Sequence, residues 1–374
     1  MDETADFAVI GGGVVGASIA YGLALSGCSV VLLDGSASDP RASAANFGLV
    51  WVQGKGPGSP DYQRLTRVSS DLWPAFSEEL TEIAGPEEGV PGPVLSYERN
   101  GGLTFTFGED GYTERESQLH RLHNERGGEN DHEMIDRAAI QRLMPEFELG
   151  PEVTGASFCW RDGCVNPLKL HSALLRAIPR LGGRVLFGSK VDTIRPVSLG
   201  WELTTATGRV GAGHVAVAAG LATKELAESV GLDIPVRPQR GQVIVSQRLP
   251  RVMTLPASTL RQTADGTFLV GATKEDVGLD RSTTLDAAGQ LARNALRITP
   301  ALRDINVVRH WAGLRVMTPD GAPIYQFSDR ASAAACHSGI TLAPVHARLF
   351  SERITGGDAD ALMAFHPARF GQTA

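Results

Sequence analysis

Short apolar runs and glycine-rich turns alternate along the first forty residues of the chain. Residues 7–10 are all apolar, which predicts a buried strand. Residues 11–16 read Gly-Gly-Gly-Val-Val-Gly, and the apolar residues 17–25 that follow predict a helix. A second apolar stretch, residues 29–33, predicts another buried strand and is followed directly by Asp34. This order of strand, glycine turn, helix, strand and acid predicts a Rossmann-like unit that binds a dinucleotide.

Each glycine of this segment has a separate physical role in such a unit. Gly11 allows a sharp turn, Gly13 leaves room for the backbone to approach a pyrophosphate, and Gly16 lets the helix pack closely on the strand. The free N–H groups at the start of the helix favour the binding of a phosphate group. Asp34 offers an acceptor to a ribose hydroxyl and repels a 2′-phosphate. The alternative is a structural turn without a ligand, but the acid lies at the expected distance of about 20 residues.

The residues after Asp34 bear on the choice between FAD and NAD, which the fingerprint alone does not make. The chain has no second glycine fingerprint, so we expect one dinucleotide site. Residues 41–53 are first small and polar and then apolar, which suits a segment that passes beneath a pyrophosphate and a flat ring. Both features favour a flavin.

The rest of the chain predicts a mixture of strands and helices. Asn166 and Pro167 suit the cap and the first position of a helix that runs to about residue 181, and residues 285–298 predict another helix. Strands are predicted at residues 184–187, 201–205 and 214–219, and within 235–248 and 255–273. Proline and glycine clusters predict loops at residues 57–60, 86–93 and 127–128.

Composition narrows the class of protein. The length of 374 residues suggests about two domains. With 42% hydrophobic and 21% charged residues, the chain is globular rather than disordered. The formal net charge of -7 provides no basic field for phosphates, which argues against a nucleic-acid partner.

Residues 7–33 carry no charged side chain and are long enough to resemble a membrane span. The acidic residues before them and the glycines within them argue against both a membrane segment and a signal peptide. We therefore expect a cytoplasmic protein without a strong membrane signal.

The four cysteines, at positions 28, 159, 164 and 336, are too few and too scattered for a disulfide framework, which favours a reducing compartment. A metal or redox pair at Cys159 and Cys164 is the alternative to two half-buried cysteines on a strand and its turn. The histidines show no zinc-like spacing with an acid, so we expect no metal site.

Several further motifs follow one another in a specific order. They lie at residues 11–16, 34, 41–48, 162–167, 218–220, 240–242, 311–315, 318–321, 323, 336–344 and 369–370. With these motifs the chain resembles the D-amino acid oxidase-like flavoproteins: glycine oxidase, sarcosine oxidase and the catalytic subunits of opine, hydroxyproline and cyanide-forming glycine dehydrogenases. The Asn-Phe-Gly-Leu-Val-Trp of residues 46–51 and the Cys-His-Ser-Gly of residues 336–339 are most similar to the opine-oxidase type.

The resemblance implies an α/β fold of the glutathione reductase-like FAD class, D-amino acid oxidase type. In this fold a Rossmann-like FAD-binding domain is joined to a mixed-sheet α+β substrate domain. It implies a discontinuous FAD-binding domain of residues 1–85, 151–225 and 310–374, and a substrate domain of residues 86–150 and 226–309.

The resemblance and the glycine fingerprint together imply bound FAD. Covalent attachment through Cys336 is the alternative, but in relatives with a cysteinyl flavin that cysteine belongs to a different local pattern, so we expect noncovalent FAD. The expected cofactor-binding residues are Gly11, Gly13, Val14, Val15, Gly16, Asp34, Gly35, Arg41, Ser43, Ala44, Asn46, Phe47, Gly48, Val191, Ala219, Gly220, Gly313, Arg315, Gly339, Ile340 and Thr341.

Arg315 and His337 are the expected catalytic residues. The resemblance implies that Arg315 grips a substrate carboxylate, since a guanidinium matches a carboxylate in two parallel bonds; a structural salt bridge is the alternative. His337 is a candidate base for the substrate ammonium, or it only forms a nearby hydrogen bond. Further substrate-pocket candidates, with core packing or a paired or solvated charge as the alternative, are Trp51, Leu49, Gln53, Lys55, Arg240, Arg261 and Lys274.

Flavins perform hydride chemistry themselves, so the protein's part is to bind and orient. We expect FAD-dependent oxidation of the C–N bond of an amino acid or N-substituted amino acid, of the D-amino acid, glycine or sarcosine, hydroxyproline or opine type, giving an imine that hydrolyses. The electrons pass to oxygen or to partner subunits. For the opine type these are a ferredoxin-like chain and a second nucleotide-binding chain; a homo-oligomer is the other arrangement. The competing hypotheses are a non-catalytic FAD-binding or assembly subunit and an NAD-dependent dehydrogenase.

Overall fold

The computed structural model describes residues 2–35, 42–124 and 131–371. Its largest sheet has eight strands: β1 (Asp2–Ile10), β2 (Val30–Leu33), β8 (Arg184–Leu186), β9 (Val191–Val197), β10 (Gly200–Thr205), β11 (Gly208–Val217), β16 (Ile324–Phe327) and β17 (Ala331–Ala335). The order is β16-β17-β11-β1-β2-β8, and β10 and then β9 extend from β11 through antiparallel pairing. The five strands from β17 to β8 are parallel.

Helices cover this sheet because its central strands are apolar on both faces. They are α1 (Val14–Leu25), α2 (Pro60–Ala84), α5 (Pro167–Arg180), α6 (Thr223–Glu228), α8 (Ala343–Val345) and α9 (Ser351–Ile354). Short helical turns accompany them: η1 (Gly220–Ala222), η3 (His346–Phe350), η4 (Asp360–Phe365) and η5 (Pro367–Phe370). The uncharged helix α1 is buried on nearly every side, against α5 and the C-terminal helices. Among the described residues, no helix has the length and apolar composition needed to cross a membrane.

A second group of strands forms two smaller sheets. Four strands run in the order β13-β14-β12-β15, with bounds β12 (Arg237–Arg248), β13 (Leu260–Gln262), β14 (Thr267–Gly271) and β15 (Val307–Met317). Three strands run in the order β4-β6-β5, with bounds β4 (Gly102–Phe107), β5 (His132–Asp136) and β6 (Val153–Cys159). The helices beside them are α3 (Gly108–Asn124), α4 (Arg137–Leu143), α7 (Leu285–Ile298) and the turn η2 (Pro300–Leu302).

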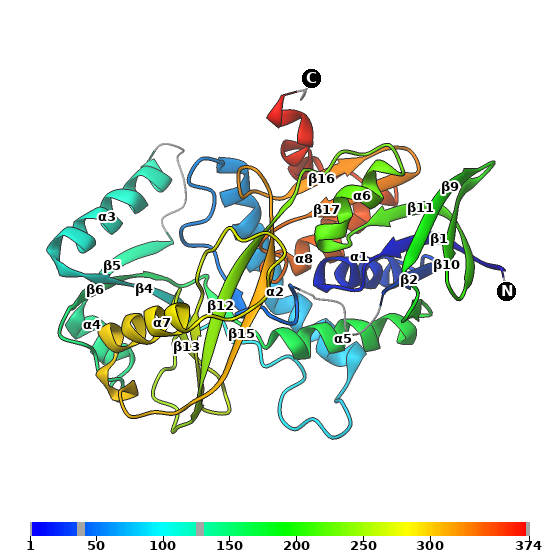
Figure 1. Ribbon diagram of the computed structural model, residues 1–374. Helices are drawn as coiled ribbons and strands as arrows, with labels where there is room; N and C mark the ends of the chain where they lie inside the picture. The colour runs from blue at the N-terminus through cyan, green and yellow to red at the C-terminus, as the bar shows by residue number, and fades with distance from the viewer. Residues whose placement is uncertain (1, 36–41, 125–130, 372–374) are drawn as a thin grey trace.

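The two groups lie side by side and share a boundary. In Figure 1, α1 and the eight-stranded sheet lie on the right, α3, α4 and the three-stranded sheet lie on the left, and β12 and β15 run between them. A two-stranded ladder at this boundary joins β3 (Leu49–Val50) to β7 (Gly163–Cys164). Strand pairing places β6 and β15 in the two smaller sheets. The division expected from the sequence put residues 151–225 and 310–374, and with them β6 and most of β15, in the FAD-binding domain.

Two of the predicted helices begin at capping side chains, of which the sequence predicted the one at Asn166. The Asn166 side chain accepts hydrogen bonds from the backbone N–H groups of Leu168 and Lys169 at the start of α5, and the Thr284 hydroxyl accepts one from Ala287 at the start of α7. Such bonds are local, which is why the sequence pattern predicts them. The long helix α2, which starts immediately after a predicted loop, was not predicted.

Candidate functional site

The glycine turn between β1 and α1 has the tight geometry that its sequence predicts. Gly11 has a φ angle of +107°, and a Cβ there would lie 2.5 Å from the carbonyl oxygen of Ala218. A Cβ on Gly16 would lie 1.9 Å from the Gly11 carbonyl oxygen, so α1 packs onto the turn at a distance that only glycine permits. Gly13 is the N-cap residue of α1. The turn therefore places the N-terminus of α1 at the end of β1, where a phosphate is favoured.

Asp34 lies beside this turn at the end of β2. Its Oδ1 atom accepts a hydrogen bond of 3.1 Å from the backbone N–H of Gly12, and the side chain is buried. The backbone carbonyls of Asp34 and Gly35 accept bonds from Ser189 and Gly188, which brings the segment leading to Val191 alongside the acid. The Val191 side chain itself is buried in the core, so the backbone is the part of Val191 that a ligand can meet.

The segment that follows β2 closes over the helix N-terminus. The Ser43 hydroxyl accepts a hydrogen bond of 2.9 Å from the backbone N–H of Val14, and Ala44 beside it is exposed. The Asn46 side chain accepts a bond of 2.7 Å from the backbone N–H of Gly48, which fixes a turn around the half-buried Phe47. Arg41 lies outside the described residues.

Two further segments complete the surroundings of α1. Ala219 follows β11 and lies against Gly11, and Gly220 has a φ angle of +64° at the start of η1. Near the C-terminus, a Cβ on Gly339 would lie 3.1 Å from the half-buried side chain of Val15. Ile340 is buried in the main core, so it offers only backbone groups to a ligand.

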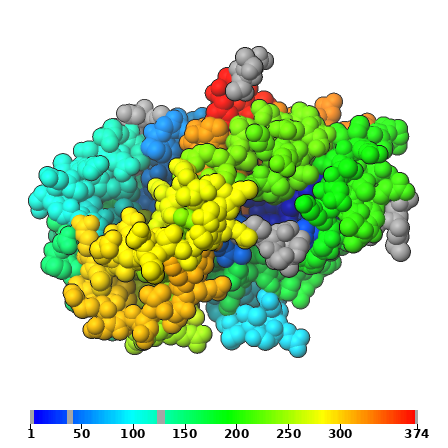
Figure 2. Space-filling view, in the orientation of Figure 1, coloured from blue at the N-terminus to red at the C-terminus, as the bar shows by residue number. Residues whose placement is uncertain are grey.

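These segments form a cradle with the features that FAD requires. It combines a helix N-terminus, close backbone approaches that a Cβ would block, and an acid at the end of the second strand. In Figure 2 part of the blue N-terminal segment is visible at the base of a hollow beside the yellow part of the chain. The residues present therefore fit a bound dinucleotide.

The four-stranded sheet turns one face toward this cradle. Gly241 of β12 lies directly opposite Gly313 of β15, so both present the same face. A Cβ on Gly313 would lie 2.4 Å from the Cβ of Ala45. Phe47 and Trp311 both pack against a cluster on this sheet that contains Val243. The absence of a side chain at Gly313 therefore allows residues 42–48 to lie directly on the sheet.

Arg315 lies on this face, two residues after Gly313. Its guanidinium covers Gly241, where a Cβ would lie 2.5 Å from the Nη2 atom, and its Nη1 donates a bond of 3.2 Å to the Arg240 carbonyl oxygen. Within the described part of the chain it forms no ion pair with a carboxylate, and burial lowers the pKa of its guanidinium. A half-buried arginine with open donors suits an incoming carboxylate.

The fit between Arg315 and Gly241 leads to a first prediction. Gly241→Ala pushes the guanidinium aside and lowers kcat/KM for an amino-acid substrate by about tenfold, because a misplaced clamp loses part of its orienting effect. FAD content stays unchanged. Steady-state kinetics measure the effect, and Gly111→Ala, where a Cβ would meet nothing within 4 Å, is the matched control. Equal kinetics for the two variants would contradict the placement.

Trp51 and Leu49 line the path from the cradle to the smaller sheets. Thr341 fixes this segment, because its hydroxyl lies 3.1 Å from the Trp51 backbone N–H and 3.4 Å from the Leu49 carbonyl oxygen. Trp51 is buried and contacts Gly102, and Leu49 is half-buried. Their contact with a substrate remains a prediction.

The Gln53 side chain is buried in a network of hydrogen bonds within the protein. Its Nε2 atom donates to Asp162 at 2.7 Å and to the Gly102 carbonyl oxygen at 3.0 Å, while its Oε1 accepts from Thr104, Ser157 and Arg115. The side chain is 2% exposed. Every polar atom of this amide is thus already used in protein contacts that hold residues 51–53 against β4 and β6, which does not favour the predicted substrate contact.

Arg261 lies on the same face of the sheet as Gly241 and Gly313. It lies opposite Leu269, and its guanidinium carbon is 6.0 Å from the centre of the Phe47 ring. A Cβ on Gly48, whose φ angle is +84°, would lie 2.9 Å from its Nη2 atom. Arg261 is therefore buried beneath the turn at Gly48, and a direct contact with substrate remains a prediction.

His337 lies among cationic side chains rather than beside an acid. Burial lowers the pKa of its imidazole to about 3, and the charges of Lys55, Arg315 and Lys274 act in the same direction. Its Nδ1 atom is 3.5 Å from the Ser338 hydroxyl oxygen. An imidazole of such low basicity accepts protons poorly, which does not favour His337 as the base, and that role stays a prediction. A hydrogen bond from His337 to the substrate remains a prediction.

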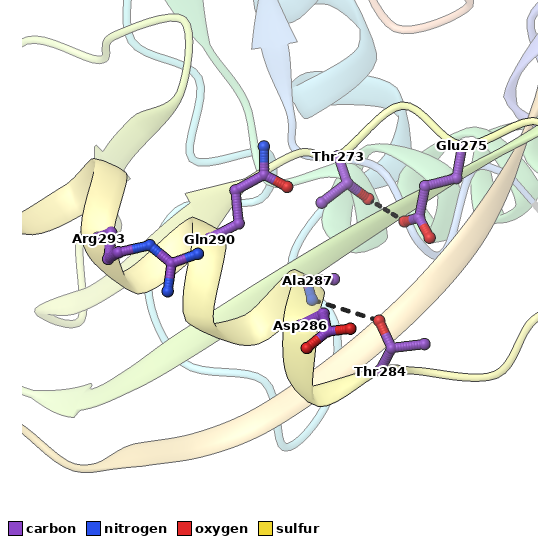
Figure 3. Close-up of a pocket in the computed structure, with 7 residues that line it drawn as sticks. All are labelled: Thr273, Glu275, Thr284, Asp286, Ala287, Gln290 and Arg293. Carbon is purple, nitrogen blue, oxygen red and sulfur yellow. Dashed lines mark hydrogen bonds between the residues drawn. The ribbon is translucent and has the colours of Figure 1, made fainter.

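Arg240 and a nearby pocket face away from Arg315. Arg240 pairs with Glu275 and Asp280, and Gln242 also donates to Glu275, so these side chains share the opposite face of β12. Figure 3 shows the pocket there, with Thr273 and Glu275 across from the start of α7. Its lining residues are Thr273, Glu275, Thr284, Asp286, Ala287, Gln290 and Arg293. Lys274 lies between Thr273 and Glu275 in the sequence, and both of these line the pocket. The charge of Lys274 nevertheless lowers the pKa of His337, which does not line the pocket.

Asp131, His132 and Cys159 lie within 4.8 Å of one another and are buried. Arg67 and Arg161 bind the Asp131 carboxylate at 2.7 and 3.0 Å. Burial raises the pKa of Asp131, but hydrogen bonds from His132 and Arg67 outweigh that effect and hold it well below its usual range, while burial raises the pKa of the Cys159 thiol. With two guanidinium groups on the acid and a protonated thiol, this cluster is a structural ion network.

The structure also brings together residues that the sequence patterns did not single out. Tyr62 on α2 and Ser338 meet beside Lys55, and the His171 ring on α5 contacts the Gly12 carbonyl oxygen at 2.5 Å. Tyr62 and Ser338 are 276 positions apart, so no local pattern could have linked them.

Comparison with known proteins agrees with this arrangement. Residues 6–353 match the family model described as FAD dependent oxidoreductase. The chain is 38% identical over 370 residues to an opine oxidase subunit of Agrobacterium tumefaciens (strain Ach5), and the match covers 98% of this chain and 97% of that protein. It is 36% identical, with the same coverage, to the corresponding opine oxidase subunit of Rhizobium meliloti.

A solved structure supports the same architecture. The glycine oxidase from Geobacillus kaustophilus has a TM-score of 0.84 and 27% identity, over 99% of both chains. The expectation of a Rossmann-like FAD-binding fold of the D-amino acid oxidase type is thereby confirmed.

Proposed function

Because the chain belongs to the family of FAD-dependent oxidoreductases, we propose that it oxidises the C–N bond of an N-substituted amino acid of the opine type. The observation that carries this proposal is Arg315, a half-buried arginine with open donors on the sheet face that meets the cofactor cradle. The relatives of highest identity reported above are named opine oxidase subunits, which favours an opine over glycine or sarcosine.

The residues around Arg315 prepare the substrate for oxidation. Arg315 holds a carboxylate and thereby fixes the position of the adjacent C–H bond. Bound FAD supplies the ring that accepts a hydride. Hydride loss requires the neutral amine, and the cations that lower the pKa of His337 also lower the pKa of an ammonium group bound beside them. The proton therefore leaves readily to water, and no dedicated base is needed.

We propose that the electrons pass to a partner subunit. Two relatives carry the word subunit in their names. The four cysteines of this chain are all free, and their spacing in the sequence does not match an iron–sulfur ligand set. A ferredoxin-like partner would supply that cluster, and a second nucleotide-binding chain would complete the assembly. The free cysteines also favour a reducing compartment, in agreement with the expected cytoplasmic location.

Anaerobic titration of the purified chain tests the proposed reaction. An opine bleaches the visible flavin band, whereas glycine, sarcosine, D-amino acids and proline derivatives do so more weakly. Admission of air restores the band slowly if a partner is the natural acceptor. A yellow protein that dithionite reduces but no amine reduces would favour the non-catalytic subunit, and a colourless protein would contradict FAD.

Acid precipitation of the same sample tests how FAD is held. The colour should remain in the supernatant, because Cys336 is a buried thiol whose pKa burial raises to about 12, so it is not an activated nucleophile. Colour in the pellet would show covalent attachment.

A further inference from the structure

The Lys55 side chain reaches Ser338, in the segment that follows β17. Its Nζ atom donates a hydrogen bond of 2.7 Å to the hydroxyl oxygen of Ser338. The Tyr62 hydroxyl donates to the same oxygen, also at 2.7 Å. Ser338 and Tyr62 are both buried, with 6% and 4% of their surface exposed. The ammonium group is therefore held in one place by two fixed side chains.

Among the described residues, two N–H bonds of the Lys55 ammonium have no hydrogen-bond acceptor. Ser338 is its hydrogen-bond partner among the described residues, and no carboxylate there lies within ion-pair distance of it. Asp162, the acid that acts on Lys55 electrostatically, already accepts bonds from Val52 and Gln53. A half-buried ammonium of this kind is costly unless a ligand provides the missing anion.

Arg315 and Lys274 belong to the same cationic group. Ser338 lies between Lys55, which donates to its hydroxyl, and the adjacent His337, and the charges of Arg315 and Lys274 act on both Lys55 and His337. Lys274 is exposed and so belongs to the rim, whereas Lys55 and Arg315 are half-buried. Across the residues that the structure describes, no acidic side chain forms an ion pair with any of the three cations. The site thus has two interior cations and one carboxylate assigned so far.

We propose that Lys55, positioned by Ser338 and Tyr62 and assisted at the rim by Lys274, binds a second carboxylate of the substrate. This inference rests on the proposed function, in which Arg315 binds the first carboxylate. Substrates are then selected for two carboxylates, one on each side of the amine, as in an N-(carboxyalkyl)amino acid. Arg261, another candidate for the substrate pocket, lies beneath the turn at Gly48 instead.

Binding of unreactive ligands tests the proposal without turnover. Oxydiacetate and the longer 3-(carboxymethoxy)propanoate carry two carboxylates joined by an ether, and methoxyacetate carries one, so none can be oxidised as an amine. Calorimetry on the FAD-loaded protein should show at least one dicarboxylate binding more tightly than methoxyacetate by about tenfold or more. Lys55→Met should abolish that preference and leave methoxyacetate binding unchanged.

Further variants separate binding from folding. Lys55→Arg keeps the charge and retains part of the preference, and Ser338→Ala weakens it by removing the fixed partner of the ammonium. Lys169→Met is the control, since that lysine donates only to the carbonyl oxygens of Pro91 and Pro93 on the surface. The flavin spectrum and the Tm of each variant verify that the fold is intact.

The pH dependence of binding gives an independent readout. Burial lowers the pKa of Lys55 to about 8, with Lys274 and Arg315 acting in the same direction and Cys336 and Asp162 against it. The ammonium is charged below that pH, so the preference for dicarboxylates should weaken as the pH rises through about 8. In Lys55→Met the preference is absent and this pH dependence disappears with it.

Several results would overturn the proposal. The proposal fails if Lys55→Met lowers the affinity for ligands with one and with two carboxylates equally. It also fails if Lys55→Met lowers the affinity for neither ligand. A shift of the flavin midpoint potential without a change in ligand preference would assign Lys55 to the cofactor instead. If the protein prefers dicarboxylates but no amine bleaches the flavin, the results contradict the proposed reaction and support the proposed carboxylate site at Lys55.

Discussion

Replacing Arg315 by methionine lowers kcat/KM for the substrate by about 30- to 5,000-fold, the equivalent of about 2–5 kcal/mol for removing one partner of a desolvated charge pair. The guanidinium covers Gly241 and has open donors toward the cofactor cradle, so its removal leaves the substrate carboxylate without a partner. Steady-state kinetics measure the loss, and the ratio of flavin to protein absorbance should stay at the wild-type value.

Two further variants define what Arg315 contributes. Arg315→Lys keeps the charge but not the planar fork, so it recovers only part of the loss. Arg237→Met removes an exposed arginine from the same sheet, where its partner is the exposed Asp276, and should change kcat/KM by less than about twofold. If Arg315→Met lost flavin but kept the wild-type kcat/KM for each flavin that stays bound, Arg315 would bind the cofactor and not the substrate.

Gly11→Ala should abolish most FAD binding, leaving less than about a tenth of the wild-type flavin content. The new Cβ would lie 2.5 Å from the Ala218 carbonyl oxygen, and the φ angle of +107° adds strain for any residue with a side chain. Together these effects cost about 2–5 kcal/mol. At about 2–4 °C per kcal/mol, the Tm should fall by about 4–20 °C.

Gly27→Ala is the matched control for that prediction. Gly27 also has a positive φ angle, +78°, but a Cβ there would meet nothing within 4 Å. Only the backbone strain remains, about 1 kcal/mol, and FAD binding should be preserved. If the two variants behaved alike, the close approach of Ala218 would have no part in holding the cofactor.

The sequence predicts best those features that depend on neighbouring residues. The glycine turn, the acid after β2 and the cap at Asn166 each depend on contacts within a short segment or on a fixed spacing, and all three are present in the structure. Periodicity and capping are local effects, so one sequence is enough to detect them.

Features built from distant segments were not accessible to the same reasoning. Lys55, Tyr62 and Ser338 meet only because α2 packs beside the segment after β17. The low basicity of His337 depends first on its burial and then on three cations from three parts of the chain. The engagement of Gln53 in a buried network likewise depends on β4, β6 and α3. In each case the tertiary environment, rather than the residue type, decides what the side chain does.

The strand order of the large sheet also constrains how the chain is made. β1 and β2 are synthesised first, but β11, the partner of β1, begins at residue 208, and β17, the partner of β11, begins at residue 331. A ribosome must therefore release most of the chain before the cofactor sheet can close, and such distant pairings form slowly. FAD can consequently be retained only near the end of synthesis, and until then the edge of β1 that pairs with β11 has no partner, which favours aggregation.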